Sequence, residues 1–351
     1  RGRGGRSGGA RRKHRRGSFC PHRGCTRHGV TQGVGSGTQL PATDYCPGVT
    51  AVHVRVPAKV NLSLRVGPVR PDNFHDVTTI FHAISLTDDV TVSEGTQGSG
   101  RTLSITGSSS SGVPADDSNL AAQAARALAT HAGLPDPDVV IDIVKSIPVA
   151  GGMAGGSANA AAALIACRRL WRLDVSDAAL REIAAAVGSD VVFALVGGTA
   201  RGTGRGEMVT PVLAAGDLHW VIALSEGELS TPRVYAEWDR LVESGHVSVG
   251  GDDAPLLAAL RTGEPRDIGP LLVNDLQSAA LSLRPSLHAV LEVGAELGAL
   301  GGIVSGSGPT CAFLASGRDA AIAIAAEMAG TGVARAVRYA TGPTVGARII
   351  A

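Results

Sequence analysis

The amino-acid sequence predicts an α+β protein of two domains behind a basic N-terminal tail. Its 351 residues, 44% of them hydrophobic, are enough for two hydrophobic cores. Segments with alternating apolar residues, typical of strands, and alanine-rich helical segments occur in both halves of the chain. From changes in composition we place the tail at 1–48 and the domains at 49–208 and 209–351.

The first 50 residues differ in charge from the rest of the chain. They hold ten of the 32 Lys and Arg residues and one of the 31 acids, which leaves 22 basic and 30 acidic residues in 51–351, a formal charge of −8. Residues 1–48 are rich in Gly, Arg and Ser without apolar periodicity. This pattern predicts a disordered, dispensable tail or spurious upstream translation.

Charge, cysteine content and hydropathy exclude several classes of protein. A mildly acidic body argues against binding to nucleic acid. Five cysteines, two of them in the body, form no disulfide framework and are typical of a reducing compartment. No apolar run reaches the roughly 18 residues of a membrane-spanning helix. These observations predict a protein of the cytoplasm that binds neither nucleic acid nor membrane. We also expect a bacterial protein that is a monomer or a homodimer.

The first domain should begin with strands. Alternation predicts strands over 52–56 and 60–66, which we expect to pair with each other. Further strands are predicted over 77–84, 88–94, 102–106 and 139–144. Helices should run over 118–131, with Ser118 as N-cap and Gly133 as stop, over 157–171, and over 177–187, capped by Asp177.

The second domain should mix helices with a short sheet. A strand over 219–224 is followed by a polar stretch. Helices are predicted near 286–299 and 318–329 and strands near 302–305, 311–315 and 333–340. No internal repeat is visible.

Lysine is rare in this chain. Lys13, Lys59 and Lys145 are the three lysines, against 29 arginines. Where Arg is the default cation, a retained Lys indicates a site that needs a compact ammonium group. Retention by chance is the alternative.

A glycine-rich segment, 147–159, joins the predicted strand 139–144 to the helix after it. Glycines allow the backbone to approach a ligand closely, and exposed N–H groups at a helix start attract polyphosphate. The segment is no P-loop, because Ser157 stands where that motif has Lys, and no dinucleotide fingerprint, because Ala150 replaces the first glycine. Close packing without a ligand is the alternative interpretation.

Seven motifs follow one another along the chain: Pro57-Ala-Lys-Val-Asn-Leu62, Arg70-Pro-Asp-Asn-Phe-His-Asp76, the loop Pro148–Asn159, Gly188-Ser-Asp-Val-Val-Phe193, Gly202-Thr-Gly-Arg-Gly-Glu207, Asn274-Asp-Leu276 and Ser305-Gly-Ser-Gly-Pro-Thr310. Together they resemble the GHMP kinases, over essentially 51–351. The resemblance implies an N-terminal domain like domain 2 of ribosomal protein S5, a ferredoxin-like C-terminal domain, and an active site in the cleft between them.

The resemblance also implies roles for single residues. Asp190 corresponds to the catalytic carboxylate and Lys59 to the ammonium that holds it ionised and stabilises the developing alkoxide. The alternatives are a helix cap and a solvated strand residue. The ATP-binding residues implied are Lys145, Pro148, Val149, Ala150, Gly151, Gly152, Met153, Ala154, Gly155, Gly156, Ser157, Ala158 and Asn159.

A cytosine-bearing substrate is implied by two aromatic residues and a histidine. Phe74 and Tyr235 resemble the pair that sandwiches the base, and His75 resembles the residue that reads its edge. Tyr235 could instead cover the start of a helix. The other substrate-binding residues implied are Asn61, Thr231, Gly306, Ser307 and Gly308.

Four positions depart from the family pattern. Asn73 replaces a Gly, Ala158 a Ser, Val192 a Pro and Gln277 a Glu. Asn tolerates left-handed backbone, so we expect the turn at Asn73 to form. None of the four removes a catalytic group.

The resemblance implies ATP-dependent phosphorylation of the 2-hydroxyl of 4-diphosphocytidyl-2-C-methyl-D-erythritol, in the non-mevalonate route to isoprenoid precursors. Mg²⁺ should bridge the ATP phosphates, held largely by nucleotide and water. The alternatives are another GHMP kinase, of homoserine or mevalonate type, and a non-catalytic nucleotide-binding protein of the same fold.

Overall fold

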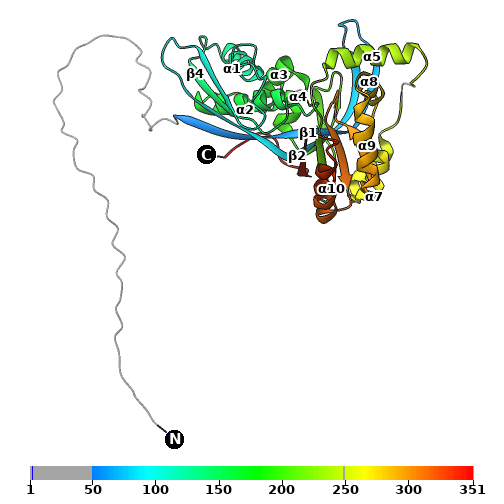
Figure 1. Ribbon diagram of the computed structural model, residues 1–351. Helices are drawn as coiled ribbons and strands as arrows, with labels where there is room; N and C mark the ends of the chain where they lie inside the picture. The colour runs from blue at the N-terminus through cyan, green and yellow to red at the C-terminus, as the bar shows by residue number, and fades with distance from the viewer. Residues whose placement is uncertain (1, 3–49, 150, 248–249, 351) are drawn as a thin grey trace, which may run out of the picture. The chain divides into compact units, whose positions relative to one another are not determined.

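The computed structural model describes residue 2 and residues 50–149, 151–247 and 250–350 (Figure 1). The tail predicted at 1–48 lies outside the described residues except for Gly2. Residues Gly48–Ala351 form one compact unit. Among the described helices, none has the length and apolarity that crossing a membrane requires.

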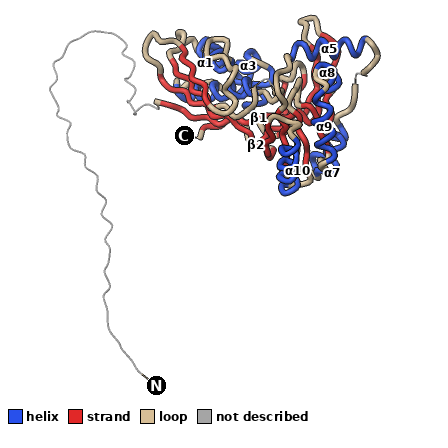
Figure 2. Tube along the Cα trace, in the orientation of Figure 1, coloured by secondary structure: helices blue, strands red, loops and turns tan. Residues whose placement is uncertain are grey.

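Runs of strands and runs of helices follow one another along the chain (Figure 2). The strands are β1 (Ala51–Val69), β2 (His75–Glu94), β3 (Arg101–Thr106), β4 (Val139–Val144), β5 (Thr199–Thr203), β6 (Met208–Pro211), β7 (Leu218–Leu224), β8 (Val273–Asn274), β9 (Gly301–Val304), β10 (Cys311–Ala315), β11 (Ala336–Gly342) and β12 (Arg348–Ile349). The helices are α1 (Leu120–His131), α2 (Gly155–Leu170), α3 (Asp177–Val187), α4 (Ser189–Val196), α5 (Thr231–Glu243), α6 (Ala254–Thr262), α7 (Pro265–Ile268), α8 (Gln277–Leu283), α9 (Ser286–Glu296) and α10 (Arg318–Thr331), with a 3₁₀ turn, η1 (Gly269–Leu271).

The first sheet has eight strands built around β1 and β2. Its main order is β12-β1-β2-β4-β3, with β5 on β2, β6 on β5 and β8 on β1. Helices α1–α4 lie together on one side of it (Figure 1), and the alanines of α2 are buried in the core they share with the sheet. Because alanine has a small side chain, α2 can approach the sheet closely.

The predicted pairing of 52–56 with 60–66 is wrong. Both segments belong to the continuous strand β1, which pairs antiparallel with β2. The alternation stops at Val56 because residues 56–64 are all buried, and the register shifts between Pro57 and Ala58, a β-bulge rather than a turn. The predicted strands 77–84 and 88–94 are likewise one strand, β2, across the same bulge.

Two predicted helix caps are each displaced by one residue. Asn119, not Ser118, accepts the N–H of Ala121 at the start of α1, and Ser176, not Asp177, accepts that of Ala179 at α3. Gly133 follows the end of α1 with a φ of +67°, as its prediction as a stop requires. In both cases the predicted cap and the actual cap are adjacent polar residues, either of which could accept a hydrogen bond at the helix start, so the prediction is displaced by only one residue.

The second sheet is antiparallel in the order β11-β7-β10-β9. With α9 after β7 and α10 after β10, the chain order is β-α-β-β-α-β, which confirms the predicted ferredoxin-like arrangement. One face packs on α9 and α10, while Trp220, Ile222 and Leu314 on the other face join the core of the first sheet. The sheet therefore connects both halves.

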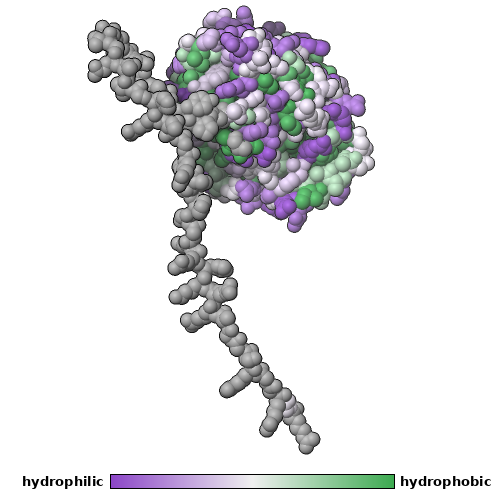
Figure 3. All heavy atoms as spheres, turned by 90° about the vertical axis from the view of Figure 1, so that its left-hand side faces the viewer, coloured by the Kyte–Doolittle hydropathy of each residue, from purple (hydrophilic) through white to green (hydrophobic). Residues whose placement is uncertain are grey.

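Two returns of the chain tie the second half to the first sheet. β12 pairs with β1 at Val54 and Arg55, and β8 pairs with β1 at Ser63 and Leu64. The predicted division at 208/209 falls within β6, a strand of the first sheet, and remains a prediction. On the face drawn in Figure 3, hydrophilic and hydrophobic residues are interspersed.

Candidate active site

A cavity of about 720 Å³ gathers most of the predicted site residues from both halves of the chain. Those on its wall are Lys59, Asn61, Lys145, Pro148, Val149, Gly151, Gly152, Ala154, Gly155, Gly156, Ser157, Asn159, Asp190, Thr231, Tyr235, Gly306 and Ser307. Met153, Ala158, Phe74, His75 and Gly308 are not on the wall. Ala150 lies outside the described residues.

The ammonium group of Lys59 is buried and faces three acceptors. It donates to Asn61 Oδ1 at 2.6 Å and to the carbonyl oxygen of Gly152 at 2.8 Å, and it lies 3.8 Å from Asp190 Oδ2. Burial lowers the pKa of Lys59, and the charge of Asp190 opposes that shift. The two hydrogen bonds fix the direction of the ammonium group, and Asp190 lies at ion-pair distance from it.

A chain of hydrogen bonds determines the orientation of Asn61. The hydroxyl of Thr79 donates to the carbonyl oxygen of Ser63 at 2.6 Å, so it can accept the Asn61 amide N–H at 2.8 Å. The amide oxygen of Asn61 is thereby directed at Lys59. Sequence reasoning missed Thr79, because its partners lie on the neighbouring strand.

Asp190 stands in the first turn of α4, where it lines the cavity. Its side chain is 30% exposed, in contrast to the buried Lys59 beside it. The first turn of a helix is the end at which its dipole favours a carboxylate. Asp190 therefore presents a carboxyl group to a ligand in the cavity, with the ammonium of Lys59 behind it.

Lys145 also borders the cavity, but a buried network holds its ammonium group. Lys145 donates to Asp88 Oδ2 and, at 3.0 Å, to Asn159 Oδ1, while Asn159 donates to Asp88 at 2.8 Å. Asp88 Oδ1 accepts the N–H groups of Ser146 and Ile147. This network joins β2, the end of β4 and the start of α2, and so fixes both ends of the glycine-rich loop.

The two glycine-rich turns of the chain touch each other at the cavity. At Gly152, with a φ of +73°, an added Cβ would lie 1.8 Å from the carbonyl oxygen of Ser305. At Gly306, with a φ of +55°, it would lie 3.2 Å from Lys59 Nζ. Asn274 donates to the carbonyl oxygens of Val304 and Gly306, both at 2.7 Å, which holds the second turn in place. Glycine is required here by close backbone approach.

The predicted base-binding residues lie together beyond the second turn. The rings of His75 and Tyr235 are stacked, with centroids 5.0 Å apart, and His75 Nε2 lies 2.9 Å from Asp239 Oδ1. Burial, with the charge of Asp190, raises the pKa of Tyr235 to about 12. Phe74 is 53% exposed, with the guanidinium of Arg205 over its ring. A base sandwiched between Phe74 and Tyr235 remains a prediction.

The four departures have local explanations. Asn73 adopts a φ of +62°, so the expected turn forms. Ala158 and Val192 are buried, so neither position offers a side chain to the solvent. Gln277 Oε1 accepts the N–H of Val304 at 2.9 Å, a bond that a Glu oxygen would also accept.

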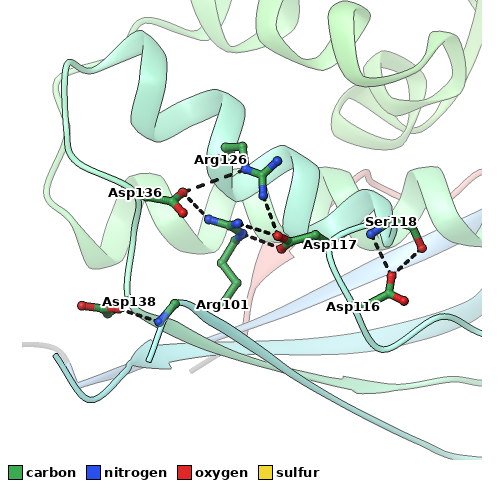
Figure 4. A network of polar contacts seen from close by, with 8 residues as sticks. Arg101, Asp116, Asp117, Ser118, Arg126, Asp136 and Asp138 are labelled. Atoms are coloured by element: carbon green, nitrogen blue, oxygen red, sulfur yellow. Dashed lines mark hydrogen bonds and ion pairs between the residues drawn. The ribbon is translucent and has the colours of Figure 1, made fainter. Parts of the chain in front are cut away.

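One end of the cavity is lined by residues that the sequence analysis missed: Val113, Pro114, Ser118, Asn119 and Leu120. Arg101 pairs with Asp117 and Asp136, and Arg126 also pairs with Asp117 (Figure 4). This network fixes the segment before α1. The signal in the sequence was Asn119, a residue type that favours the start of a helix. In the structure it caps α1, is buried and lines the cavity.

Helix α5 was also missed, because the stretch after β7 was interpreted as polar. It begins at Thr231, whose hydroxyl lies 2.9 Å from that of Ser307 and so joins the helix to the second glycine turn. Val234, Trp238 and Leu241 are its buried residues. Their spacing of three to four residues is the signal that could have predicted the helix.

Comparisons with known proteins agree on one family. Residues 119–198 match the GHMP kinases N terminal domain and residues 256–334 match the GHMP kinases C terminal domain. The 4-diphosphocytidyl-2-C-methyl-D-erythritol kinase of Nocardia farcinica (strain IFM 10152) is 54% identical over 300 residues, which are 85% of this chain and 96% of the relative.

Solved structures give the same result for the fold. A crystal structure of 4-(cytidine 5'-diphospho)-2C-methyl-D-erythritol kinase is 31% identical, with a TM-score of 0.65 over 82% of this chain and 98% of that one. A homoserine kinase from Cytophaga hutchinsonii has a TM-score of 0.66 at 19% identity, over 87% and 99% of the two chains. The second likeness shows the fold alone.

Proposed function

The chain belongs to the GHMP kinases, and from this premise we propose that it transfers the γ-phosphoryl group of ATP to the 2-hydroxyl of 4-diphosphocytidyl-2-C-methyl-D-erythritol. The products are ADP and the 2-phosphate. The observation that carries the proposal is the approach of Lys59 to within 3.8 Å of Asp190 on the wall of a cavity that the glycine-rich loop also borders. The reaction would take place in the bacterial cytoplasm.

Asp190 accepts the proton of the substrate hydroxyl as its oxygen attacks the γ-phosphorus. Its partial exposure allows contact with a substrate, and its ionised form is an acceptor. Lys59 stabilises the negative charge that develops on the attacking oxygen, with its direction fixed by Asn61 and Gly152. Positioning and charge stabilisation supply most of the catalysis in phosphoryl transfer.

The glycine-rich loop holds the triphosphate of ATP. Gly151, Gly152, Gly155 and Gly156 line the cavity at the start of α2, where backbone N–H groups and the helix dipole favour negative charge. Beyond the loop, the end of the cavity around Asn119 and Leu120 takes the adenine base. The opposite end, with Thr231 and Tyr235, takes the cytidyl substrate.

Mg²⁺ fits this cavity as an ion carried by the nucleotide. Among the described residues, no three His, Cys, Asp or Glu side chains gather as a ligand cluster. Mg²⁺ usually keeps several waters and binds through phosphates, so the nucleotide and water would hold it here and Asp190 would stay available to the substrate hydroxyl. When bound, the ion would reduce the mutual repulsion of the ATP phosphates.

The experiment that tests the proposal is an ADP-release assay on the full chain with a panel of alcohols. We expect turnover with the cytidyl substrate and none with homoserine or mevalonate. Turnover of homoserine or mevalonate alone would assign the chain to a different reaction within the family. If none of the three alcohols leads to ADP release but the chain still binds ATP, it would be a non-catalytic nucleotide-binding protein.

A further inference from the structure

Two arginines on the cavity wall, Arg205 and Arg233, have no role in the chemistry described above. Within the described part of the wall, the side-chain cations are Lys59, Lys145, Arg205 and Arg233. The two lysines face the carboxylates of Asp190 and Asp88. ATP and a diphosphate-bearing substrate bring far more negative charge than the lysines retain, so arginines of the wall must meet part of it.

Arg205 stands on a tight turn between β5 and β6 that leans against β2. Gly204 and Gly206 have φ values of +75° and +102°, and the N–H of Val77 donates to the carbonyl oxygen of Gly204 at 2.7 Å. The N–H of Arg205 itself donates to Glu207 at 2.6 Å. The turn is thus fixed from both sides, and the position of Arg205 with it.

The guanidinium of Arg205 lies over the ring of Phe74, 5.2 Å from its centroid. The Nε of Arg205 forms an ion pair with Glu207 at 3.8 Å, the same separation as between Lys59 and Asp190. Among the described residues, none accepts a hydrogen bond from the guanidinium, so its terminal N–H groups can still bind an anion. An arginine that stacks on an aromatic ring keeps its N–H donors in the plane, where they can grip two oxygens of one phosphate. Arg205 is therefore an available anion-binding group.

The turn also touches the reacting end of the cavity. A Cβ added to Gly206 would lie 3.9 Å from the Cβ of Ser189, the neighbour of Asp190. Arg205 thus borders the interval between Phe74, one of the two rings predicted to hold the cytosine, and Asp190, where the proposed function places the 2-hydroxyl. The substrate's diphosphate joins these two groups and must cross the interval that Arg205 borders.

We propose that Arg205 binds the diphosphate of the cytidyl substrate and so selects for a nucleoside diphosphate over an unphosphorylated nucleoside. This inference rests on the proposed function. Phe74 supports the guanidinium from one side, so a lysine at this position keeps the charge but loses the stacking and the two-pronged contact. Arg205 acts on substrate binding rather than on the transferred phosphoryl group.

The test compares CDP with cytidine as ligands of the full chain, by calorimetry, for the wild type, Arg205→Ala and Arg205→Lys. We expect Arg205→Ala to weaken CDP binding about tenfold, as for one lost charge-assisted contact, and to leave cytidine binding unchanged. Arg205→Lys should lie between. In the assay, KM for the cytidyl substrate should rise about tenfold while KM for ATP stays constant.

Arg201→Ala is the matched control. Arg201 is an exposed arginine of the adjoining strand β5 and borders a separate hollow beside Arg65, so we expect wild-type CDP binding. The inference would be overturned if Arg205→Ala bound CDP as tightly as the wild type does. It would also be overturned if Arg205→Ala lost as much affinity for cytidine as for CDP, because the arginine would then act on the base. Failure of the wild type to phosphorylate the cytidyl substrate would instead overturn the proposed function.

Discussion

Two lysines border the same cavity with buried ammonium groups, and each faces a carboxylate. Around Lys59 the carboxylate is Asp190, which is 30% exposed and 3.8 Å away. Around Lys145 it is Asp88, which is fully buried and hydrogen-bonded on both oxygens. An ion pair that is open on its acidic side can exchange a proton with a ligand, whereas a sealed pair can only hold neighbouring segments in place. We therefore assign chemistry to the first pair and loop positioning to the second.

The largest expected effect is on turnover at the open pair. Lys59→Ala and Asp190→Asn should each lower kcat by roughly 10³-fold, since each removes a group that acts on the developing charge or the proton. Equilibrium binding of ATP should persist in both, because the glycine-rich loop is unchanged. Normal ADP release by Asp190→Asn would mean that another group accepts the proton.

Substitutions in the buried pair of Lys145 and Asp88, the sealed pair, should change the stability of the fold rather than turnover. Asp88→Ala leaves the buried ammonium of Lys145 and two N–H groups without their acceptor, and we expect the free energy of unfolding to fall by about 3–5 kcal/mol. Denaturant titration measures this, with Asp190→Ala as the control that should lose far less. Equal losses in both variants would remove the distinction between the pairs.

The two asparagines sharpen the same comparison. Asn61→Ala frees the ammonium of Lys59 to turn and should lower kcat roughly 10- to 100-fold, beyond the stability of about 1–3 kcal/mol lost with its two buried hydrogen bonds. Asn159→Ala removes buried hydrogen bonds to Asp88 and Lys145 and should cost about 1–3 kcal/mol of stability. Steady-state kinetics and denaturant titration of both variants decide whether the effects separate in this way.

Acid should lower the free energy of unfolding through His82, which lies on β2 beside the strand that carries Lys59. His82, opposite Val60 on β1, has a pKa lowered to about 3 by burial, against an ordinary value of about 6.5. Below pH 6.5 the unfolded chain binds a proton that the folded chain excludes, so stability should fall by about 1.4 kcal/mol per pH unit toward pH 3. If a His82→Gln variant lost stability with falling pH as steeply as the wild type, protonation of His82 would not be the cause.

The sequence predicted this site better than the contacts that support it. Lys59, Asp190 and the glycine-rich loop carry local motifs, and the structure brings them to one cavity. Asp88 was missed because its partner Lys145 lies 57 residues further along the chain, a separation that periodicity cannot bridge. The break at Pro57 was misread because a bulge and a turn interrupt alternation in the same way.

The account depends most directly on Lys59 and Asp190 acting as one unit on one alcohol oxygen. The measurement that tests it is kcat for Lys59→Ala, Asp190→Asn and the double variant, with folding of each checked by denaturant titration. Groups that act as a unit are strongly non-additive, so the double variant should be about as slow as the slower single variant. Losses that multiply in the double variant would show that the two residues act independently and would contradict the account.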